Sequence, residues 1–543
     1  MIKNTKKHQK RVAWLLLVLL VLTGCTAGKE AGNADRKEKY NTETTAEIQS
    51  EADGEGLAAD GQESNLKKAV TPIGVETGHY YDYYWDDVFD NITASVKYPY
   101  MNLSDEDRKA YPELEQAVTQ LMEERKESRL KLYSEAIQTG AGYFTEDREY
   151  ADSFEVSETV TVRRADTRVL SLMLDGYYYV GGAHGYPYNM GAAFDTETGK
   201  RLALTDVITD MELLPEAVEK ELETFWDMEY FYENLDMAIF FQEYLDDVQW
   251  VLDYHGITFY FNPYEIAPYA SGISNVTISF ADYPELFHQE YQEIPKSYGV
   301  ELSPGGKFYY DVDGDERLDT LIISAAKGEE ENYESQTIRI NDAEYEEDSG
   351  IYEIEPVLVH TTEGRNYLYV GQQYPDDFWV YSIYDVSDGS VEKIDVVYSG
   401  RHSIIKWEEE YYARQVLTDP QNFLLDTFTQ MLGTAYGYNI YQVGTDGLPV
   451  KEHDWYYIGS EIEFTMQKDL TVAVVDEEGK TTGETEVKTG AKVRYYRTDG
   501  ENWADILLSD GRIGRVFPEY SNGYWTVDGI DVEEVFEGII FGG

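Results

Sequence analysis

The segment VSETVTVRRADTRVLSLMLDGYYYV (Val156–Val180) alternates apolar and polar residues and is rich in β-branched and aromatic side chains. This pattern is typical of β-strands that bury one face and expose the other. Its end overlaps YYYVGGAHGYPYNM (Tyr177–Met190), in which three closely spaced glycines favour a tight turn. The fold is therefore expected to be organised around strands on either side of this turn.

On the N-terminal side, NITASVKYPYM (Asn91–Met101) alternates in the same way and predicts another strand. Ser104, followed by three acidic residues, predicts the start of a helix. Pro112 fits the first turn of a longer helix, in which apolar residues recur at helical spacing as far as Ile137. Gly140 is a suitable residue to end that helix.

On the C-terminal side, Ala192–Leu204 predicts two strands around a turn, and Leu214–Trp250 has the spacing of helices. Gly256–Phe280 predicts two strands around a loop rich in proline and glycine. Strands and helices that come in separate runs favour an α+β fold for residues 76–292.

The rest of the chain is predicted to be mostly β. Residues 300–455 form a β-rich region, and residues 460–520 contain short strands separated by close turns such as EEGK and SDGR. Residues 521–543 are expected to be a C-terminal capping segment with a short helix at Asp531–Phe541.

The N-terminus has the features of a lipoprotein signal peptide. Residues 1–11 carry five basic residues and no acidic one, and an 11-residue apolar run, Val12–Leu22, follows. LTGC (Leu22–Cys25) then resembles a bacterial lipobox, which predicts that residues 1–24 are removed and that Cys25 is lipidated. An ordinary signal peptide is the alternative. Residues 25–75 contain little to bury and are expected to be a disordered tether.

These features predict a protein outside the cytoplasm, on the cell membrane, with a lipid anchor as its only membrane contact. The chain has 543 residues and a formal net charge of −60, from 104 acidic and 44 basic residues. Such a charge repels nucleic acid and attracts basic partners and divalent cations. Solubility alone is an equally physical reason for it.

The turn at Gly181–Gly185 contains His184, which invites a functional interpretation. A zinc site needs several N or S ligands, and neither H-x-H nor HExxH occurs; G-x-S-x-G is also missing. We therefore expect no enzyme activity. His184 either orders its turn or belongs to a ligand-binding surface, whose candidate residues are Gly181, Gly182, His184, Gly185, Tyr186, Tyr188, Asn262, Tyr264, Glu265 and Tyr269.

The segment DVDGDERLD (Asp311–Asp319) has the spacing of a calcium-binding loop. It lacks the glycine and glutamate of an EF-hand at the sixth and twelfth positions, so a solvated acidic turn is the alternative. The predicted Ca²⁺ ligands are Asp311, Asp313, Asp315 and Asp319.

Several of these segments resemble known families. GGAHG (Gly181–Gly185), FDTETGKRLALTDVI (Phe194–Ile208) and FYFNPYEIAPYASG (Phe259–Gly272) resemble the extracytoplasmic domain of RsiV-type anti-sigma factors, domain-of-unknown-function family 3298. The preceding segment Val96–Leu174 resembles the domain that these proteins share with the deacetylase PdaC, and Lys492–Phe517 resembles a bacterial SH3-type domain. The resemblance implies a receptor domain for lysozyme, followed by a β-rich region and a small SH3-like β-barrel.

The function predicted from the sequence is a lipid-anchored extracytoplasmic protein that binds a basic protein such as lysozyme. One alternative is a binding module for peptidoglycan or another cell-wall glycan. The other is an uncharacterised hydrolase. The strong positive charge of lysozyme agrees with the acidic chain, although many basic proteins would agree equally well.

Overall fold

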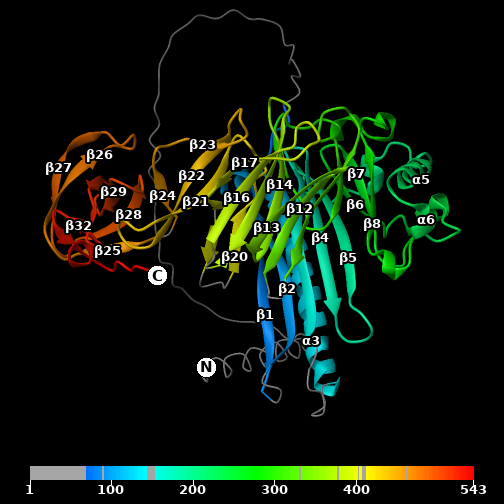
Figure 1. Ribbon diagram of the computed structural model, residues 1–543, viewed down its shortest axis with the longest axis horizontal. Helices are drawn as coiled ribbons and strands as arrows, with labels where there is room; N and C mark the ends of the chain where they lie inside the picture. The colour runs from blue at the N-terminus through cyan, green and yellow to red at the C-terminus, as the bar shows by residue number, and fades with distance from the viewer. Residues whose placement is uncertain are drawn as a thin grey trace, which may run out of the picture. The chain divides into compact units, whose positions relative to one another are not determined.

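The computed structural model (Figure 1) describes residues 69–87, 91–143, 153–328, 332–375, 378–401, 403–406, 411–459 and 461–542. The predicted signal peptide, Cys25 and residues 25–68 of the predicted tether lie outside the described residues. Ile73 and Val75, at the end of the predicted tether, are buried in the fold. None of the helices in the described part of the chain has the length and apolar character needed to cross a membrane.

The N-terminal part is built on a seven-stranded sheet in the order β19-β20-β1-β2-β3-β4-β5. Strands β2 and β3 pair in parallel, and the other neighbours in this sheet pair antiparallel. The strands far apart in sequence, β20 and β1, therefore share one sheet. The bounds are β1 Val75–Asp86, β2 Asn91–Leu103, β3 Phe154–Ala165, β4 Val169–Tyr179, β5 Tyr186–Asp195, β19 Ser403–Lys406 and β20 Tyr411–Gln415.

Two helices connect β2 to β3, as the sequence predicts. Ser104 caps α2 (Asp105–Ala110), since its hydroxyl accepts a hydrogen bond from the Asp107 backbone N–H at 3.2 Å. Helix α3 begins at Pro112 and continues past Gly140 to Tyr143, so the predicted end at Gly140 is wrong. A single glycine costs a helix only about 1 kcal/mol, which the other residues of a long helix offset. Apolar residues of α3 pack on one face of the seven-stranded sheet.

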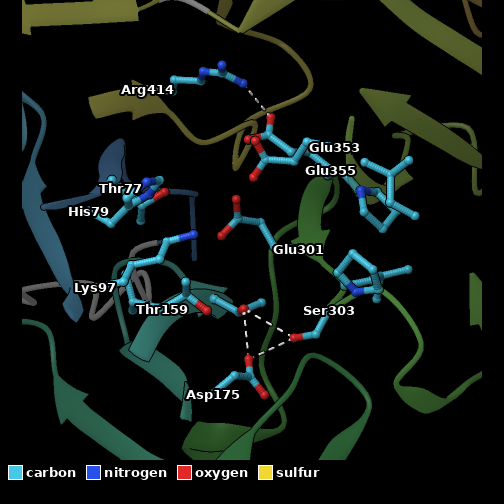
Figure 2. A pocket seen from close by; sticks show the side chains of 18 residues that line it. Thr77, His79, Lys97, Thr159, Asp175, Glu301, Ser303, Glu353, Glu355 and Arg414 are labelled. Atoms are coloured by element: carbon cyan, nitrogen blue, oxygen red, sulfur yellow. Dashed lines mark hydrogen bonds and ion pairs between the residues drawn. The ribbon is translucent and has the colours of Figure 1, made fainter. Parts of the chain in front are cut away.

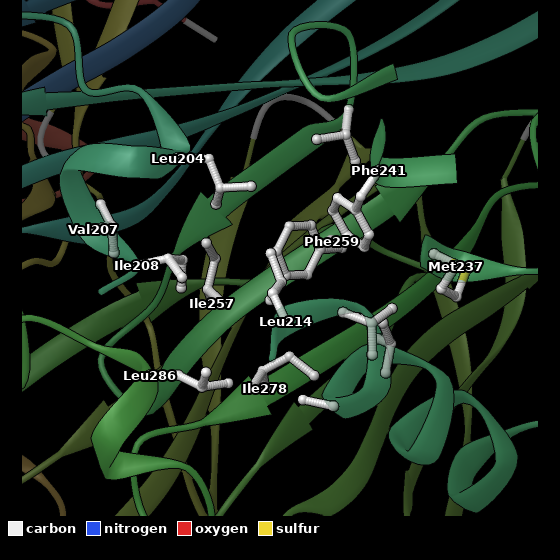
Figure 3. Close-up of a cluster of buried hydrophobic side chains, with 14 of the residues drawn as sticks. Leu204, Val207, Ile208, Leu214, Met237, Phe241, Ile257, Phe259, Ile278 and Leu286 are labelled. Carbon is white, nitrogen blue, oxygen red and sulfur yellow. The ribbon is translucent and has the colours of Figure 1, made fainter. Parts of the chain in front are cut away.

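The next layer combines a three-stranded sheet with short helices, and its core is shown in Figure 3. Leu214–Trp250 is not continuously helical: it contains two α-helices, a 3-10 helix and the start of a strand. The second strand predicted within Ala192–Leu204 is also absent, because after β5 the chain turns at Gly199, makes one bridge from Phe194 to Arg201 and enters a helix. The bounds are α4 Leu204–Val207, α5 Leu214–Phe225, α6 Met237–Tyr244, β6 Gln249–Leu252, β7 Gly256–Phe261 and β8 Ser274–Ser279. Short 3-10 helices are η1 Met228–Tyr230, η2 Tyr269–Ser271, η3 Pro284–Leu286 and η4 Gln289–Tyr291.

The middle region is β-rich, as predicted, and forms a four-stranded and a five-stranded sheet. Their shared core includes the fully buried rings of Tyr298, Tyr310 and Tyr384. The four-stranded sheet contains β10 Lys307–Tyr310, β11 Asp319–Lys327, β12 Tyr333–Ile340 and β13 Ala343–Ile351. The five-stranded sheet contains β9 Tyr298–Glu301, β14 Glu353–His360, β15 Asn366–Tyr374, β16 Phe378–Asp385 and β17 Glu392–Val397.

The C-terminal strands join a twelve-stranded sheet network and a three-stranded sheet, and the strand order of the described residues shows no closed barrel. The predicted terminal helix is shorter than Asp531–Phe541, because α7 covers only Val532–Val535. The network contains β18 Gly400–Arg401, β21 Phe423–Thr429, β22 Ala435–Val443, β23 Pro449–Lys451, β24 Tyr456–Ile458, β25 Glu463–Met466, β26 Leu470–Val475, β27 Thr481–Val487, β28 Lys492–Thr498, β29 Ala504–Leu508, β30 Ile513–Val516 and β34 Phe536–Glu537. The small sheet contains β31 Glu519–Ser521, β32 Tyr524–Val527 and β33 Ile530–Asp531.

Two buried arginines of β3 bind groups in the layers beside it. The Arg164 guanidinium binds Asp166 at 2.7 Å, and both side chains are fully buried. The same guanidinium donates to the carbonyl oxygens of Tyr291 at 2.7 Å and Glu293 at 2.9 Å. Next to it, Arg163 binds Asp253 at 2.8 Å. Strand β3 is therefore fixed by charge-assisted hydrogen bonds as well as by its sheet partners.

Candidate functional site

Two loops that are about 80 residues apart in sequence meet at one end of the strands. We call residues 180–185, between β4 and β5, together with residues 262–273, between β7 and β8, the loop surface. The Tyr269 hydroxyl donates to the carbonyl oxygen of Gly185 at 2.6 Å. The His184 ring stacks on the Tyr269 ring, with centroids 3.8 Å apart and an angle of 26° between the planes. The two predicted motifs therefore form one surface.

Glycine is required at the turn for two physical reasons. Gly181 and Gly182 have φ angles of 101° and 107°, a region that other residues rarely adopt. At Gly185 a Cβ atom would lie 2.1 Å from the Tyr177 hydroxyl oxygen, so the ring of Tyr177 covers this glycine. The turn is shaped both by its backbone angles and by an aromatic side chain.

Asn262 and Tyr186 join the second loop to strand β5. The Asn262 side-chain oxygen accepts from the Asn189 backbone N–H at 2.7 Å, and the Tyr186 hydroxyl donates to the Pro263 carbonyl at 3.2 Å. The Glu265 carboxylate accepts from the Asn262 backbone N–H at 2.9 Å. Three of the predicted residues thus make hydrogen bonds that hold the loop surface together.

Tyr264 is a predicted residue whose side chain is available to a partner. Its side chain is 54% exposed, and its φ angle of 76° is unusual for a residue with a side chain. Its ring lies 5.8 Å from that of Tyr269, which in turn stacks on the exposed His184. A strained, exposed tyrosine beside a histidine suits contact with another molecule.

Tyr188 differs from the other predicted residues, because it faces α3 rather than the loop surface. Its hydroxyl contacts Glu158 and Arg129, and Glu158 also binds Arg125 at 2.6 Å. Burial and the charge of Glu158 raise the pKa of Tyr188. Its place in a buried polar network gives Tyr188 a structural role.

Three of the four predicted calcium ligands come together. Carboxylate oxygens of Asp311, Asp313 and Asp315 lie within 4.8 Å of one another, and burial raises the pKa of Asp311. Asp319 faces a different group of atoms, since its carboxylate accepts from the Val312 backbone N–H at 3.0 Å and from the Asn341 amide at 2.5 Å. The three converging carboxylates suit a hard cation, and Asp319 supports the loop through its hydrogen bond with the Val312 backbone.

A cavity of about 390 Å³ lies between the seven-stranded sheet and the middle region. Figure 2 shows the side chains that line it. We call it the inter-sheet cavity. Nothing in the motifs of the sequence predicts it, because its lining comes from β1, β2, β3, β4, β9, β14 and β20 and from the residues that directly follow β9. Its charged and polar lining side chains are Thr77, His79, Lys97, Thr159, Thr161, Asp175, Glu301, Ser303, Glu353, Glu355 and Arg414.

The polar groups of the inter-sheet cavity are held in place by one another. Asp175 accepts from the hydroxyls of Ser303 at 2.8 Å and Thr161 at 3.2 Å, and burial raises the pKa of Asp175. Arg414 binds Glu355 at 3.0 Å, with its guanidinium 3.6 Å from the centre of the Trp379 ring.

His79 lies on the opposite side of this cavity from Ser303 in Figure 2. Burial, and then the charges of Lys97 and Arg414, lower the pKa of His79 to about 4. The imidazole is therefore neutral near pH 7 and has one donor and one acceptor nitrogen. No sequence motif marks His79, whose place beside Arg414 depends on the pairing of β1 with β20.

Comparison with known proteins supports two of the proposed domains. Residues 206–281 match the family model "Protein of unknown function (DUF3298)", and residues 88–186 match "Deacetylase PdaC". Both domains are therefore present in the chain, in the expected order. No curated protein sequence matches it.

Solved structures similar to this chain include DUF3298 proteins from two bacteria. A member of the family from Bacteroides fragilis is 17% identical, with a TM-score of 0.29, over 41% of this chain and 96% of the other. A DUF3298 family protein from Pseudomonas aeruginosa is also 17% identical, with a TM-score of 0.29, over 41% of this chain and 98% of the other.

Proposed function

We propose that this protein is a lipid-anchored, extracytoplasmic binding protein whose loop surface contacts a basic protein such as lysozyme, without catalysing a reaction. The observation that carries the proposal is the meeting of two separate loops, which presents Tyr264, Tyr269 and His184 together. Rigid aromatic side chains of this kind dominate many protein interfaces. The net charge of −60 supplies long-range attraction to a basic partner.

Calorimetric titration of the full chain with lysozyme tests this proposal. Tyr264→Ala should weaken binding at least tenfold, whereas Tyr352→Ala, which removes a similarly exposed tyrosine elsewhere, should not. Cytochrome c, a basic protein of unrelated fold, separates recognition from net charge. Equal binding of both proteins, or equal loss in both variants, would argue against the loop surface as the contact site.

A cell-wall glycan is a second candidate ligand, favoured by a row of aromatic rings on the C-terminal sheet. Neighbouring ring centroids are 6.0 Å apart between Phe428 and Tyr436, 5.8 Å between Tyr438 and Tyr457, and 6.0 Å between Tyr457 and Tyr496. Phe428 and Tyr436 are both more than half exposed. The resemblance of Lys492–Phe517 to SH3-type domains agrees with such a role. Sedimentation with purified wall sacculi should decrease for Phe428→Ala if this face is used.

We also propose that the loop Asp311–Asp315 binds Ca²⁺. The support is the convergence of three carboxylates within 4.8 Å. Calcium should raise the melting temperature of the full chain, and a chelator should reverse the rise. Asp313→Asn should remove the shift, while Asp342→Asn, at an exposed position outside the cluster, should keep it. A wild-type melting temperature that does not respond to calcium would contradict the metal site.

A further inference from the structure

The inter-sheet cavity has the size of a small-molecule site but not its usual apolar lining. Its volume of about 390 Å³ lies within the range of about 300–1,000 Å³ that is typical of ligand pockets. Its lining contains four carboxylates, from Asp175, Glu301, Glu353 and Glu355, against two cations, from Lys97 and Arg414. A ligand for this cavity must therefore be polar and charged.

Lys97 is the group in the cavity that most requires a partner. Its side chain extends from β2 into the cavity (Figure 2), and its ammonium makes no ion pair or hydrogen bond with any residue that the structure describes. Arg414, by contrast, already binds Glu355 and stacks on Trp379. An anionic group of a ligand would form an ion pair with the Lys97 ammonium. The neutral imidazole of His79 is a further hydrogen-bonding group near Lys97.

The cavity also presents carboxylates. Glu301 lies in the middle of the cavity in Figure 2, with Glu353 above it and Asp175 below it. One Glu301 oxygen accepts from the Val162 backbone N–H at 2.9 Å, which fixes the position of this buried side chain. A carboxylate has about four lone-pair sites, so one that already accepts a hydrogen bond can also receive an ammonium group.

Neither a simple anion nor a simple cation suits this arrangement. The four carboxylates oppose an anion that approaches Lys97, and Lys97 opposes a cation that approaches the carboxylates. Both repulsions are stronger than they would be in water, because water screens charges less inside a cavity. A molecule with both charges places each one beside its complement.

We propose that the inter-sheet cavity is a second binding site, separate from the loop surface, for a small zwitterion that carries both a carboxylate and an ammonium group, as an amino acid or a peptide end does. The carboxylate binds Lys97, and the ammonium binds the group of Glu301, Glu353 and Asp175. Because the carboxylates outnumber the cations by four to two, a ligand with an additional ammonium group is favoured. This site does not depend on a protein partner.

Calorimetric titration of the full chain with three probes tests the proposal. L-lysine carries both charges and an extra ammonium, n-butylamine carries the cation alone and acetate the anion alone. L-lysine should bind at least tenfold more tightly than either of the other probes. Lys97→Met should reduce its affinity at least tenfold, whereas Lys480→Met, which removes an exposed lysine elsewhere, should leave it unchanged.

A second pair of variants tests the carboxylate side. Glu353→Gln should weaken L-lysine binding, and Glu392→Gln, at an exposed position on β17, should not. Bound L-lysine should also raise the melting temperature of the wild type more than that of Glu353→Gln. Because each shift is measured against the same variant without ligand, this comparison holds even if Glu353→Gln is less stable. Absence of binding, equal binding of n-butylamine, or an unchanged affinity in Lys97→Met would overturn the proposal. None of these results depends on whether lysozyme binds.

Discussion

The loop surface and the inter-sheet cavity are built in different ways from the same set of strands. The loop surface comes from two short segments, which are held together by backbone carbonyls and aromatic rings. The cavity is lined largely by charged and polar side chains, which come from residues spread along the chain between Thr77 and Arg414. The first site is exposed and aromatic and suits a macromolecule, whereas the second is a partly open, charged cavity and suits a small polar ligand.

Removing the ion pair that fixes β3 should have the largest effect, because β3 supports both sites. Arg164→Ala leaves the fully buried Asp166 without its guanidinium partner and should lower the free energy of unfolding by about 3–5 kcal/mol. Denaturant unfolding measures this change. Arg168→Ala is the matched control: its ion pair with Glu293 is 3.7 Å long and about one-third exposed, so the expected cost is below about 1 kcal/mol. Equal costs for the two variants would show that burial of the pair does not decide its contribution.

The cavity should make stability depend on pH through His79. Its pKa falls from 6.5 to about 4 on folding, so the unfolded chain binds more protons than the folded chain between these values. The contribution of His79 is therefore complete above pH 6.5 and is lost as the pH falls toward 4, by roughly 3 kcal/mol at about 1.4 kcal/mol per pKa unit.

Unfolding free energies measured between pH 8 and pH 4 check this expectation. His79→Gln should make the free energy of unfolding depend less steeply on pH in that interval. Part of the slope should remain, since burial also lowers the pKa of His255 to about 4. A slope that is identical in the wild type and in His79→Gln would contradict the assignment to the cavity.

Gly185→Ala should disturb the loop surface and leave the cavity unchanged. The added methyl group would lie 2.1 Å from the Tyr177 hydroxyl oxygen, so the Tyr177 ring must move, at a cost of about 1–3 kcal/mol. Gly483→Ala is a suitable control, because no atom lies within 4 Å of its added Cβ. Gly185→Ala should lower the melting temperature and weaken lysozyme binding, while L-lysine binding is retained. A parallel loss of L-lysine binding would mean that the two sites are not separate.

The difference between the sites also explains how much the sequence could predict. Alternation predicted the strands at Asn91–Met101 and Val156–Val180, and Ser104 and Pro112 predicted helix starts, because these signals are local. The two halves of the loop surface were found for the same reason: each is a continuous motif rich in glycine and aromatic residues. Tyr188 belongs to the same motif and lies on the same face of β5 as Tyr186, yet its hydroxyl contacts Glu158 and Arg129, partners that the local pattern does not reveal.

The cavity could not be predicted, because no short segment contains it. His79 and Arg414 come together through the pairing of β1 with β20, and Asp175 meets Ser303 across two layers. Asp319 illustrates the same limit within one loop, since its spacing fits calcium but its carboxylate accepts from Val312 and Asn341. Spacing gives the order of ligands along the chain, whereas the direction of a side chain depends on its tertiary neighbours.

The smallest effects on stability are expected within the loop surface itself, where they distinguish support from contact. His184→Ala removes the stack on Tyr269 and should lower the free energy of unfolding by about 1 kcal/mol. Tyr264→Ala removes an exposed ring, and alanine must adopt the same unusual backbone angle as the tyrosine. The free energy of unfolding should therefore change by less than about 0.5 kcal/mol. Lysozyme binding should show the reverse order, with the greater loss in Tyr264→Ala. If His184→Ala instead kept full stability and lost binding, His184 would be the contact residue, and the loop surface would present a histidine rather than a tyrosine to its partner.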